Sequence, residues 1–184
     1  MSWIQQISDN DADGRLAELY EDIGKKRGKV ANILRVQSLN PEALKGHLDF
    51  YMTLLFGNSP LKRKQREMIA VVVSSINQCS YCINHHAESL KKLSKDEEWT
   101  NRLAKNYREA TLAADERAML EYCEEVTRSA TSSEERLETL RNHGFSDRAI
   151  LDMNMITGYF NFVNRMANGL GVGFDDNEVK GYKV

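Results

Sequence analysis

The chain has 184 residues, of which 41% are apolar and 28% charged, and its formal net charge is -2. This length and composition predict one globular domain with its own core, and the near-neutral charge without a basic stripe argues against a nucleic-acid partner. The longest apolar run, at residues 69–73, is far shorter than the roughly 20 residues that span a bilayer, and the polar, acidic first 13 residues do not resemble a secretory signal. We therefore expect a cytoplasmic protein that binds neither nucleic acid nor membrane.

Helical periodicity dominates the first half of the chain. A second helix is predicted from Asn40-Pro41, a capping residue followed by a proline at the first helical position, to Gly57. Ser59-Pro60 predicts the same kind of start for a third helix, which runs to Ile76; its β-branched stretch is also typical of a strand, but no alternating segment elsewhere supplies a partner strand. A first helix precedes these two in the sequence. Its apolar residues recur at the spacing of one helix face, and a glycine ends it: Leu16, Leu19, Tyr20 and Ile23, then Gly28.

The second half of the chain continues the helical pattern. No linker-like stretch, glycine-rich dinucleotide motif or phosphate loop interrupts it, so nucleotide cofactors are not indicated. The sequence predicts an all-α, single-domain, multi-helix bundle over residues 1–184. The further helix starts are predicted at Cys79 (to about Lys92), at Ser94 with Glu97 as a capping box, near Ala114, near Ser133 and near Ser146, the last helix ending at Gly169 and Gly171.

The chemically informative segment contains a C-x-x-C pair, Cys79 and Cys82, at the start of the helix predicted for about 79–92. Residues three apart on a helix have α-carbons about 5 Å apart, a separation that a disulfide tolerates. At about 100° per residue, Cys79, Cys82 and His86 share one helix face, whereas His85 points about 100° away from His86. A helix start and a nearby imidazole both favour a thiolate, so this face predicts a redox-active dithiol with a base.

Reduction of a hydroperoxide needs a thiolate that attacks the outer oxygen, a proton for the leaving alkoxide, and a second thiol that resolves the sulfenic acid. We assign Cys82 as the attacking thiolate, His86 as the proton carrier and Cys79 as the resolving thiol, although the two cysteine roles are interchangeable. Glu67, on the preceding helix, is assigned to orient or charge His86. No cofactor beyond the Cys79–Cys82 disulfide is expected.

The spacing of these residues resembles a known family. Glu67, eleven intervening residues, C-S-Y-C and three residues to His86 are similar to the active-site pattern of the alkyl hydroperoxidase D (AhpD) family within the carboxymuconolactone decarboxylase superfamily. The Asn40-Pro41 helix and the closing Y-F-N-F-V-N-R-M-A-N-G-L-G-V resemble its subgroup of uncharacterised peroxidase-related enzymes, so the resemblance covers nearly the whole chain. It implies an AhpD-like all-helical fold, thiol peroxidase or disulfide reductase activity, and a homo-oligomer of three or six subunits.

One position departs from the family pattern, because well-known members carry histidine where this chain has Tyr81. A phenol donates a hydrogen bond but is a poor base near neutral pH. We expect Tyr81 and His85 to line the site rather than to carry its chemistry. Cys123 lies in an apolar helical stripe and is expected to be a buried core thiol. His47 and His143 are interpreted as structural or exposed.

Two alternatives use the same residues. The first is a disulfide reductase that acts on a protein or lipoyl partner. A thiol or lipoyl protein is also the kind of reductant that a peroxidase needs. The second is a zinc-stabilised helical interaction module, in which Cys79, Cys82, His86 and Glu67 or His85 would be the ligands. Structural zinc sites usually draw their ligands from separated segments, so a metal is not expected here.

Overall fold

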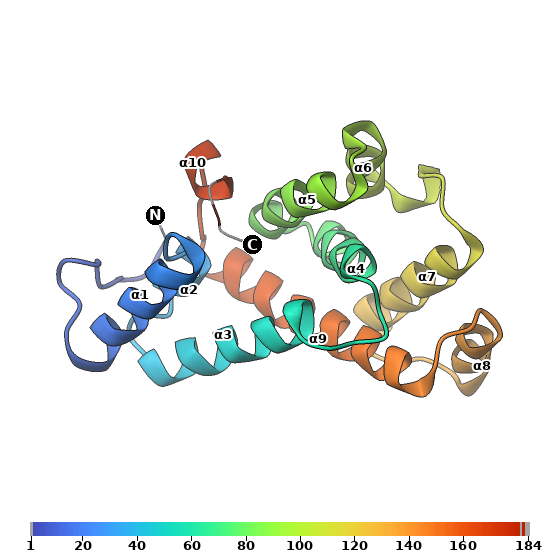
Figure 1. Ribbon diagram of the computed structural model, residues 1–184, viewed down its shortest axis with the longest axis horizontal. Coiled ribbons are helices and arrows are strands. Elements are labelled where there is room, and N and C mark those ends of the chain that lie inside the picture. Colours follow the sequence, from blue (N-terminus) through green and yellow to red (C-terminus); the bar gives the residue numbers. More distant parts are fainter. Residues whose placement is uncertain (1, 181, 183–184) are drawn as a thin grey trace.

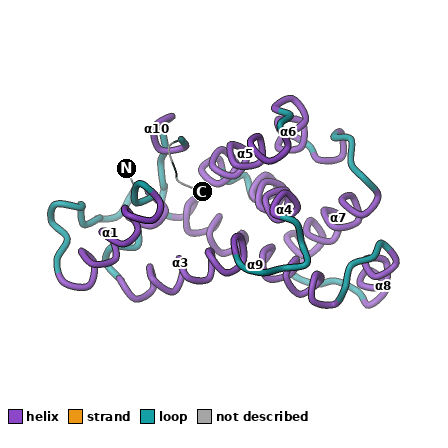
Figure 2. The backbone as a smooth tube through the Cα atoms, in the orientation of Figure 1, coloured by secondary structure: helices purple, strands orange, loops and turns teal. Residues whose placement is uncertain are grey.

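The computed structural model describes residues 2–180 and 182, and these residues form ten α-helices, one short 3-10 helix and no strand. Figure 2 shows helices joined by loops along the whole described chain. The predicted all-α class is therefore confirmed. None of the described helices is both long and apolar enough to cross a membrane. The helices are α1 (Gly14–Arg27), α2 (Asn32–Arg35), α3 (Pro41–Phe56), α4 (Arg63–Ile76), α5 (Ser80–Ser94), α6 (Glu97–Lys105), the 3-10 helix η1 (Tyr107–Glu109), α7 (Ala114–Ser129), α8 (Glu134–Asn142), α9 (Asp147–Gly169) and α10 (Asp176–Val179).

Helix α4 lies at the centre of the main core. Every residue from Met68 to Val73 is almost completely buried, because α5, α7 and α9 pack around this helix. In Figure 1 the green α4 lies among these three helices, with α3 and α9 running below it. A helix that is apolar all round belongs in the interior of a bundle. The β-branched stretch of α4 is therefore a buried helix and not a strand.

A second, smaller core lies under α1, α2 and the start of α3. Its buried side chains include Leu19, Ile23, Leu34 and Leu44, and Ile33 packs against both cores. Figure 1 shows these three helices together at one end of the molecule, with the short α10 beside α2. The N-terminal helices thus form an extension of the bundle that reaches the C-terminal segment.

Several predicted helix ends are confirmed by their capping bonds. Gly28 ends α1 in the left-handed conformation with φ +88°, which a glycine adopts without a steric penalty. Asn40 Oδ1 accepts a hydrogen bond from the backbone N–H of Ala43 at 3.1 Å, with Pro41 at the first helical position as expected. Ser133 and Ser146 cap α8 and α9 in the same way.

Two predicted helix starts are wrong. Pro60 precedes α4, which begins only at Arg63, because the Ser59 hydroxyl accepts from the Leu61 N–H and donates to Asp152 instead of capping a helix. Ser94 is the last residue of α5. Lys95 follows it in the left-handed conformation. The N-cap of α6 is therefore Asp96, whose side chain accepts from the Trp99 N–H at 2.8 Å.

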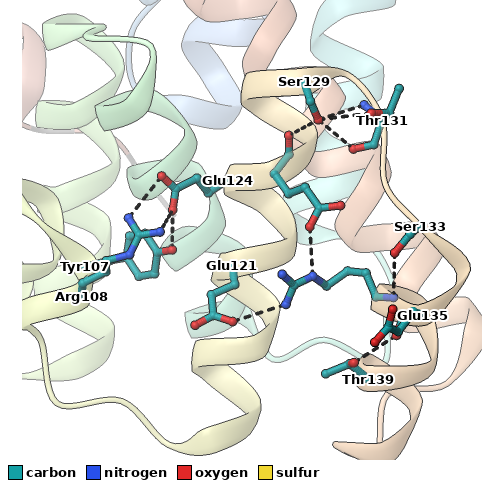
Figure 3. A network of polar contacts seen from close by, with 11 residues as sticks. Tyr107, Arg108, Glu121, Glu124, Ser129, Thr131, Ser133, Glu135 and Thr139 are labelled. Carbon is teal, nitrogen blue, oxygen red and sulfur yellow. Dashed lines mark hydrogen bonds and ion pairs between the residues drawn. The ribbon is translucent and has the colours of Figure 1, made fainter.

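A network of hydrogen bonds and ion pairs connects neighbouring segments at the outer end of the bundle (Figure 3). Glu124 on α7 accepts hydrogen bonds from the Tyr107 hydroxyl at 2.5 Å and from Arg108 at 2.7 Å, and it pairs with Arg128 at 2.8 Å. Burial opposes ionisation of this carboxyl, but these donors outweigh it and lower the pKa of Glu124 to about 2. The network joins the segment after α6 to α7 at a point far from the cysteine pair.

Candidate active site

The cysteine pair lies at the turn between α4 and α5. Gln78 makes the turn with φ +54°, a conformation uncommon for a residue other than glycine. Cys79 then precedes the helix as its N-cap residue: its N–H donates to the Ser74 carbonyl at 2.9 Å and its carbonyl accepts from Ile83. Cys82 lies in the first turn of α5. The predicted helix start at Cys79 is thus displaced by one residue, and the pair spans the helix terminus.

Both cysteines are free thiols and both are buried, Cys79 completely and Cys82 with 3% of its surface exposed. The hydrogen bond with Cys82 lowers the pKa of Cys79 to about 7, against the opposing effect of burial. The same hydrogen bond, together with burial, raises the pKa of Cys82 well above its usual value. In the reduced pair the first negative charge therefore resides on Cys79, stabilised by a thiol that donates to it.

Glu67 and His86, which the sequence analysis assigns to the site, lie in contact. The Nδ1 atom of His86 lies 2.6 Å from Oε2 of Glu67, whose side chain is completely buried on α4. Burial raises the pKa of Glu67, but the nearby His86 and the ion pair with Arg63 at 2.5 Å outweigh it and lower that pKa. Because the carboxylate only accepts hydrogen bonds, Nδ1 carries the proton, and Nε2 remains available for proton exchange.

Arg63 was not anticipated as a site residue. It lies one helical turn before Glu67 and pairs with the carboxylate oxygen that His86 does not contact. Its positive charge favours the ionised form of the buried Glu67. The i, i+4 spacing of an arginine and a glutamate on one helix is the sequence signal that indicates such a pair.

A pocket with a volume of about 100 Å³ opens above this site and is lined by both Cys82 and His86. Cys79 is not among its lining residues. The walls are largely aromatic. The His86 ring packs edge-on against Phe160, with 4.7 Å between ring centroids, and against Tyr51, with 6.3 Å between ring centroids. The pocket therefore brings Cys82, but not Cys79, together with the imidazole of His86.

Tyr81 and His85 also line this pocket, and both interact with the C-terminal segment. The Tyr81 hydroxyl donates to Glu178 Oε1 at 2.8 Å, and His85 stacks on the Tyr81 ring at 4.1 Å. Burial opposes ionisation of Glu178, but hydrogen bonds from His85, the Asn32 N–H and Tyr81 lower its pKa to about 2. Tyr81 is therefore not the proton carrier that a histidine at this position would be.

The sequence interpretation missed the polar residues beneath the thiols. Asn164 on α9 donates to the Ser74 hydroxyl at 3.0 Å and accepts from Asn77 at 3.0 Å, and both Asn164 and Ser74 are completely buried. A hydrogen bond from the Asn164 side chain contributes to the lowered pKa of Cys79. A sequence signal did exist, because Asn161, Asn164 and Asn168 recur at helical spacing near the C-terminal end of this helix.

The remaining candidates fall outside the cysteine site. Cys123 is completely buried in the main core, as predicted, and burial raises its pKa to about 12. His143 is exposed at the end of α8. Within residues 2–180 and 182 no group of three or more His, Cys, Asp or Glu side chains is arranged to hold a metal ion.

Comparisons with known proteins agree with this architecture. Residues 41–125 match the carboxymuconolactone decarboxylase family. The crystal structure of an uncharacterised peroxidase-related protein from Silicibacter sp. TM1040 is 36% identical in sequence, with a TM-score of 0.83 over 96% of this chain and 91% of that one. A peroxidase-related protein with an AhpD core, from Ralstonia eutropha JMP134, is 28% identical, with a TM-score of 0.88 over 97% and 94% of the two chains. The chain belongs to the AhpD-like proteins of the carboxymuconolactone decarboxylase superfamily.

The similarity extends to part of a larger protein. Mouse Sestrin-3 is 35% identical over 99 residues, which are 53% of this chain and 20% of the sestrin. This chain thus matches about a fifth of that relative's length.

Proposed function

We propose that this protein is a thiol peroxidase that reduces organic hydroperoxides through a Cys79–Cys82 dithiol/disulfide cycle. The observation that carries the proposal is the 2.6 Å contact between the buried Glu67 and His86, because His86 lines the same pocket as Cys82 and a second free thiol, Cys79, lies beside Cys82 in the sequence motif. A peroxidase-related, antioxidant role at the level of the family agrees with the relatives.

The reaction follows from these groups. The Cys82 thiolate attacks the outer oxygen of the hydroperoxide: an S–O bond forms, the O–O bond breaks, and the sulfur is oxidised to a sulfenic acid. The alkoxide leaves as an alcohol with the proton that His86 took from the thiol. Cys79 then attacks the sulfenic sulfur, which releases water and forms the disulfide. A thiol protein or a dihydrolipoyl group supplies the two electrons and two protons that restore the dithiol.

The roles of the two cysteines follow from different observations. The hydrogen bond between them favours the thiolate on Cys79, whereas only Cys82 lines the pocket. Attack requires contact with the peroxide, so access decides the role and Cys82 is the attacking group. Cys79, already the better thiolate, suits the resolving step, which needs a nucleophile next to the sulfenic acid.

The test is thiol-dependent consumption of cumene hydroperoxide by the wild type and by a double Cys79→Ser, Cys82→Ser variant. Cys123→Ala is the matched control, since it removes the third thiol and leaves the pair intact. Mass spectrometry after peroxide addition should find Cys79 linked to Cys82. Turnover that survives in the double variant would falsify the proposal. A faster reaction with a lipoyl or protein disulfide than with any peroxide would favour the disulfide reductase.

The assembly and location are part of the same proposal. Phe50 on α3 and Phe162 and Leu151 on α9 are 43%, 53% and 53% exposed, which supports self-association of the chain, and the subunit number of three or six follows from the family resemblance. Light scattering on a size-exclusion column measures the subunit count directly. A site that requires reduced cysteines supports a cytoplasmic location, where thiols are kept reduced.

A further inference from the structure

A chain of hydrogen bonds behind the aromatic wall of the pocket joins residues distant in sequence. His47 on α3 lies with Nδ1 2.6 Å from the Gln37 amide nitrogen and with Nε2 2.6 Å from the hydroxyl of Tyr159 on α9. His47 and Tyr159 are 8% and 5% exposed, and both line the pocket. Neither was predicted to belong to the site, since His47 was interpreted as structural or exposed.

The direction of each hydrogen bond in this chain is fixed. The Gln37 amide nitrogen also lies 2.8 Å from the carbonyl of Ile33, which can only accept, so this atom is the NH₂ group and donates to His47 as well. Nδ1 of His47 is therefore an acceptor. Burial lowers the pKa of His47 to about 4, which keeps the ring neutral near pH 7 and leaves the single proton on Nε2. Nε2 therefore donates a hydrogen bond to the hydroxyl oxygen of Tyr159.

The hydroxyl of Tyr159 is then left with its own hydrogen to donate. Within the described part of the chain no protein atom accepts it: the only hydrogen bond of this hydroxyl is the one from His47. The Tyr159 ring packs against Tyr51 and Phe160, the two aromatic side chains that also contact His86. The hydroxyl thus has an uncommitted hydrogen in a pocket that also contains Cys82 and His86.

Tyr159 remains a neutral donor over a wide pH range. Burial raises the pKa of Tyr159 well above its usual value, and the negative charges that Tyr51 and Cys82 can carry raise it further. Tyr159 and Cys82 both line the same pocket.

We infer that Tyr159 is a further catalytic residue, whose hydroxyl, aimed by His47 and Gln37, donates a hydrogen bond to the oxygen that leaves when Cys82 attacks a hydroperoxide. This inference rests on the proposed peroxidase function. His47 and Gln37 are positioning residues, because they act only through Tyr159.

The chemistry of the step explains why such a donor is useful. As the sulfur–oxygen bond forms and the oxygen–oxygen bond breaks, negative charge develops on the alkoxide oxygen before His86 delivers the proton. A fixed donor in a dry pocket stabilises that charge without the reorganisation that water would need. Tyr159 keeps its own proton throughout, so the atom and electron balance of the peroxidase reaction is unchanged.

The test compares two reactions of the same thiol in the Tyr159→Phe variant. Oxidation by cumene hydroperoxide, followed in a single turnover, should slow about 100-fold, which is the usual effect of removing one donor to a developing oxyanion. Alkylation of Cys82 by iodoacetamide should keep the wild-type rate, because iodide leaves without such help. The matched control is Tyr122→Phe. It removes a buried hydroxyl that bonds Asn154 at 2.7 Å outside the pocket, and it should leave both rates unchanged.

The positioning role is tested at His47. In His47→Gln a side-chain amide can still donate to Tyr159, so peroxide reactivity should be largely kept, whereas His47→Leu should lose about 10-fold while alkylation stays constant. A Tyr159→Phe variant that reacts with peroxide as fast as the wild type overturns the inference alone. Equal slowing of alkylation also overturns it, since the tyrosine would then support the thiolate or the fold. A wild type that reacts with no hydroperoxide overturns the proposed function itself.

Discussion

Glu67 Oε2 and His86 Nδ1 lie 2.6 Å apart across nineteen positions of sequence, with the carboxylate completely buried and the imidazole at the pocket wall. The contact exists because α4 and α5 are packed against each other through the turn that carries Cys79. A carboxylate only accepts hydrogen bonds, so this contact fixes which ring nitrogen of His86 carries the proton.

The first prediction follows from this pair. Glu67→Gln keeps the shape of the side chain but removes its charge, so the charge-assisted hydrogen bond that holds the proton of His86 on Nδ1 is lost, and peroxide reduction near pH 7 should fall about 100-fold. The measurement is the single-turnover rate of disulfide formation, with circular dichroism as a check on folding. Glu116→Gln, which breaks an ion pair with Lys64 at 3.2 Å outside the pocket, is the control and should react normally. Normal reactivity of Glu67→Gln would exclude the carboxylate from the mechanism.

The second prediction concerns the shared proton of the cysteine pair. In Cys82→Ala the pKa of Cys79 should rise from about 7 towards the ordinary value, because the donating thiol is gone. In Cys79→Ala the pKa of Cys82 should fall, since the hydrogen bond that raises it is lost. Thiolate absorbance against pH measures both. Opposite shifts of this kind are specific to a hydrogen-bonded pair, and unchanged values in both variants would show that the thiols titrate independently.

The third prediction separates Cys82 from Cys123. At pH 8 iodoacetamide should modify Cys82, which lines the pocket, and leave Cys123 unmodified, since complete burial raises the pKa of Cys123 to about 12. Cys123 should react only after denaturation. Peptide mass spectrometry before and after addition of guanidinium is the measurement. Modification of Cys123 in the native protein would contradict the packing of α7 in the core.

Much of the fold was accessible from the sequence because helical spacing and capping residues are local signals. Asn40-Pro41 and Ser146 mark true helix starts. Ser59 failed as a signal because its hydroxyl bonds a residue 93 positions away, Asp152, and no local pattern contains that contact. Ser94 failed because Asp96, two residues later, competes for the same role, and the backbone at Lys95 decides between them.

The same distinction applies to the site. Cys79, Cys82 and His86 lie within two turns of one helix, so spacing alone places them together. His47 and Tyr159 are 112 positions apart, and only the packing of α3 against α9 brings them together. A lone histidine in a helix carries no pattern that distinguishes a pocket residue from a structural one. Contacts of this kind become visible only in three dimensions.

The fourth prediction concerns the polar support of the cysteine turn. Asn164→Leu changes the side-chain volume little but removes a hydrogen-bond partner from Ser74, which is buried, and from Asn77, which is half-buried. The free energy of unfolding should therefore fall by about 1–3 kcal/mol. The pKa of Cys79 should also rise, because Asn164 is one of the groups that lower it. Chemical denaturation and thiol titration measure the two effects. Asn161→Leu, one turn earlier on the same helix, is the comparison: it should lower stability without moving the thiol pKa as far.

The last prediction gives the pH dependence of stability at the outer end of the bundle. Donors from Tyr107, Arg108 and Arg128 lower the folded-state pKa of Glu124 to about 2, against an ordinary value of 4.5 in the unfolded chain. A group whose pKa is depressed by folding stabilises the folded state above its unfolded pKa, and this contribution is lost as the pH falls from about 4.5 to about 2. In Glu124→Gln the free energy of unfolding should therefore be lower than wild type at pH 6, and the difference should shrink towards pH 2. Urea denaturation at a series of pH values measures it. A difference that is constant over this range would show that the loss in the variant comes from packing and that the charge of Glu124 does not contribute.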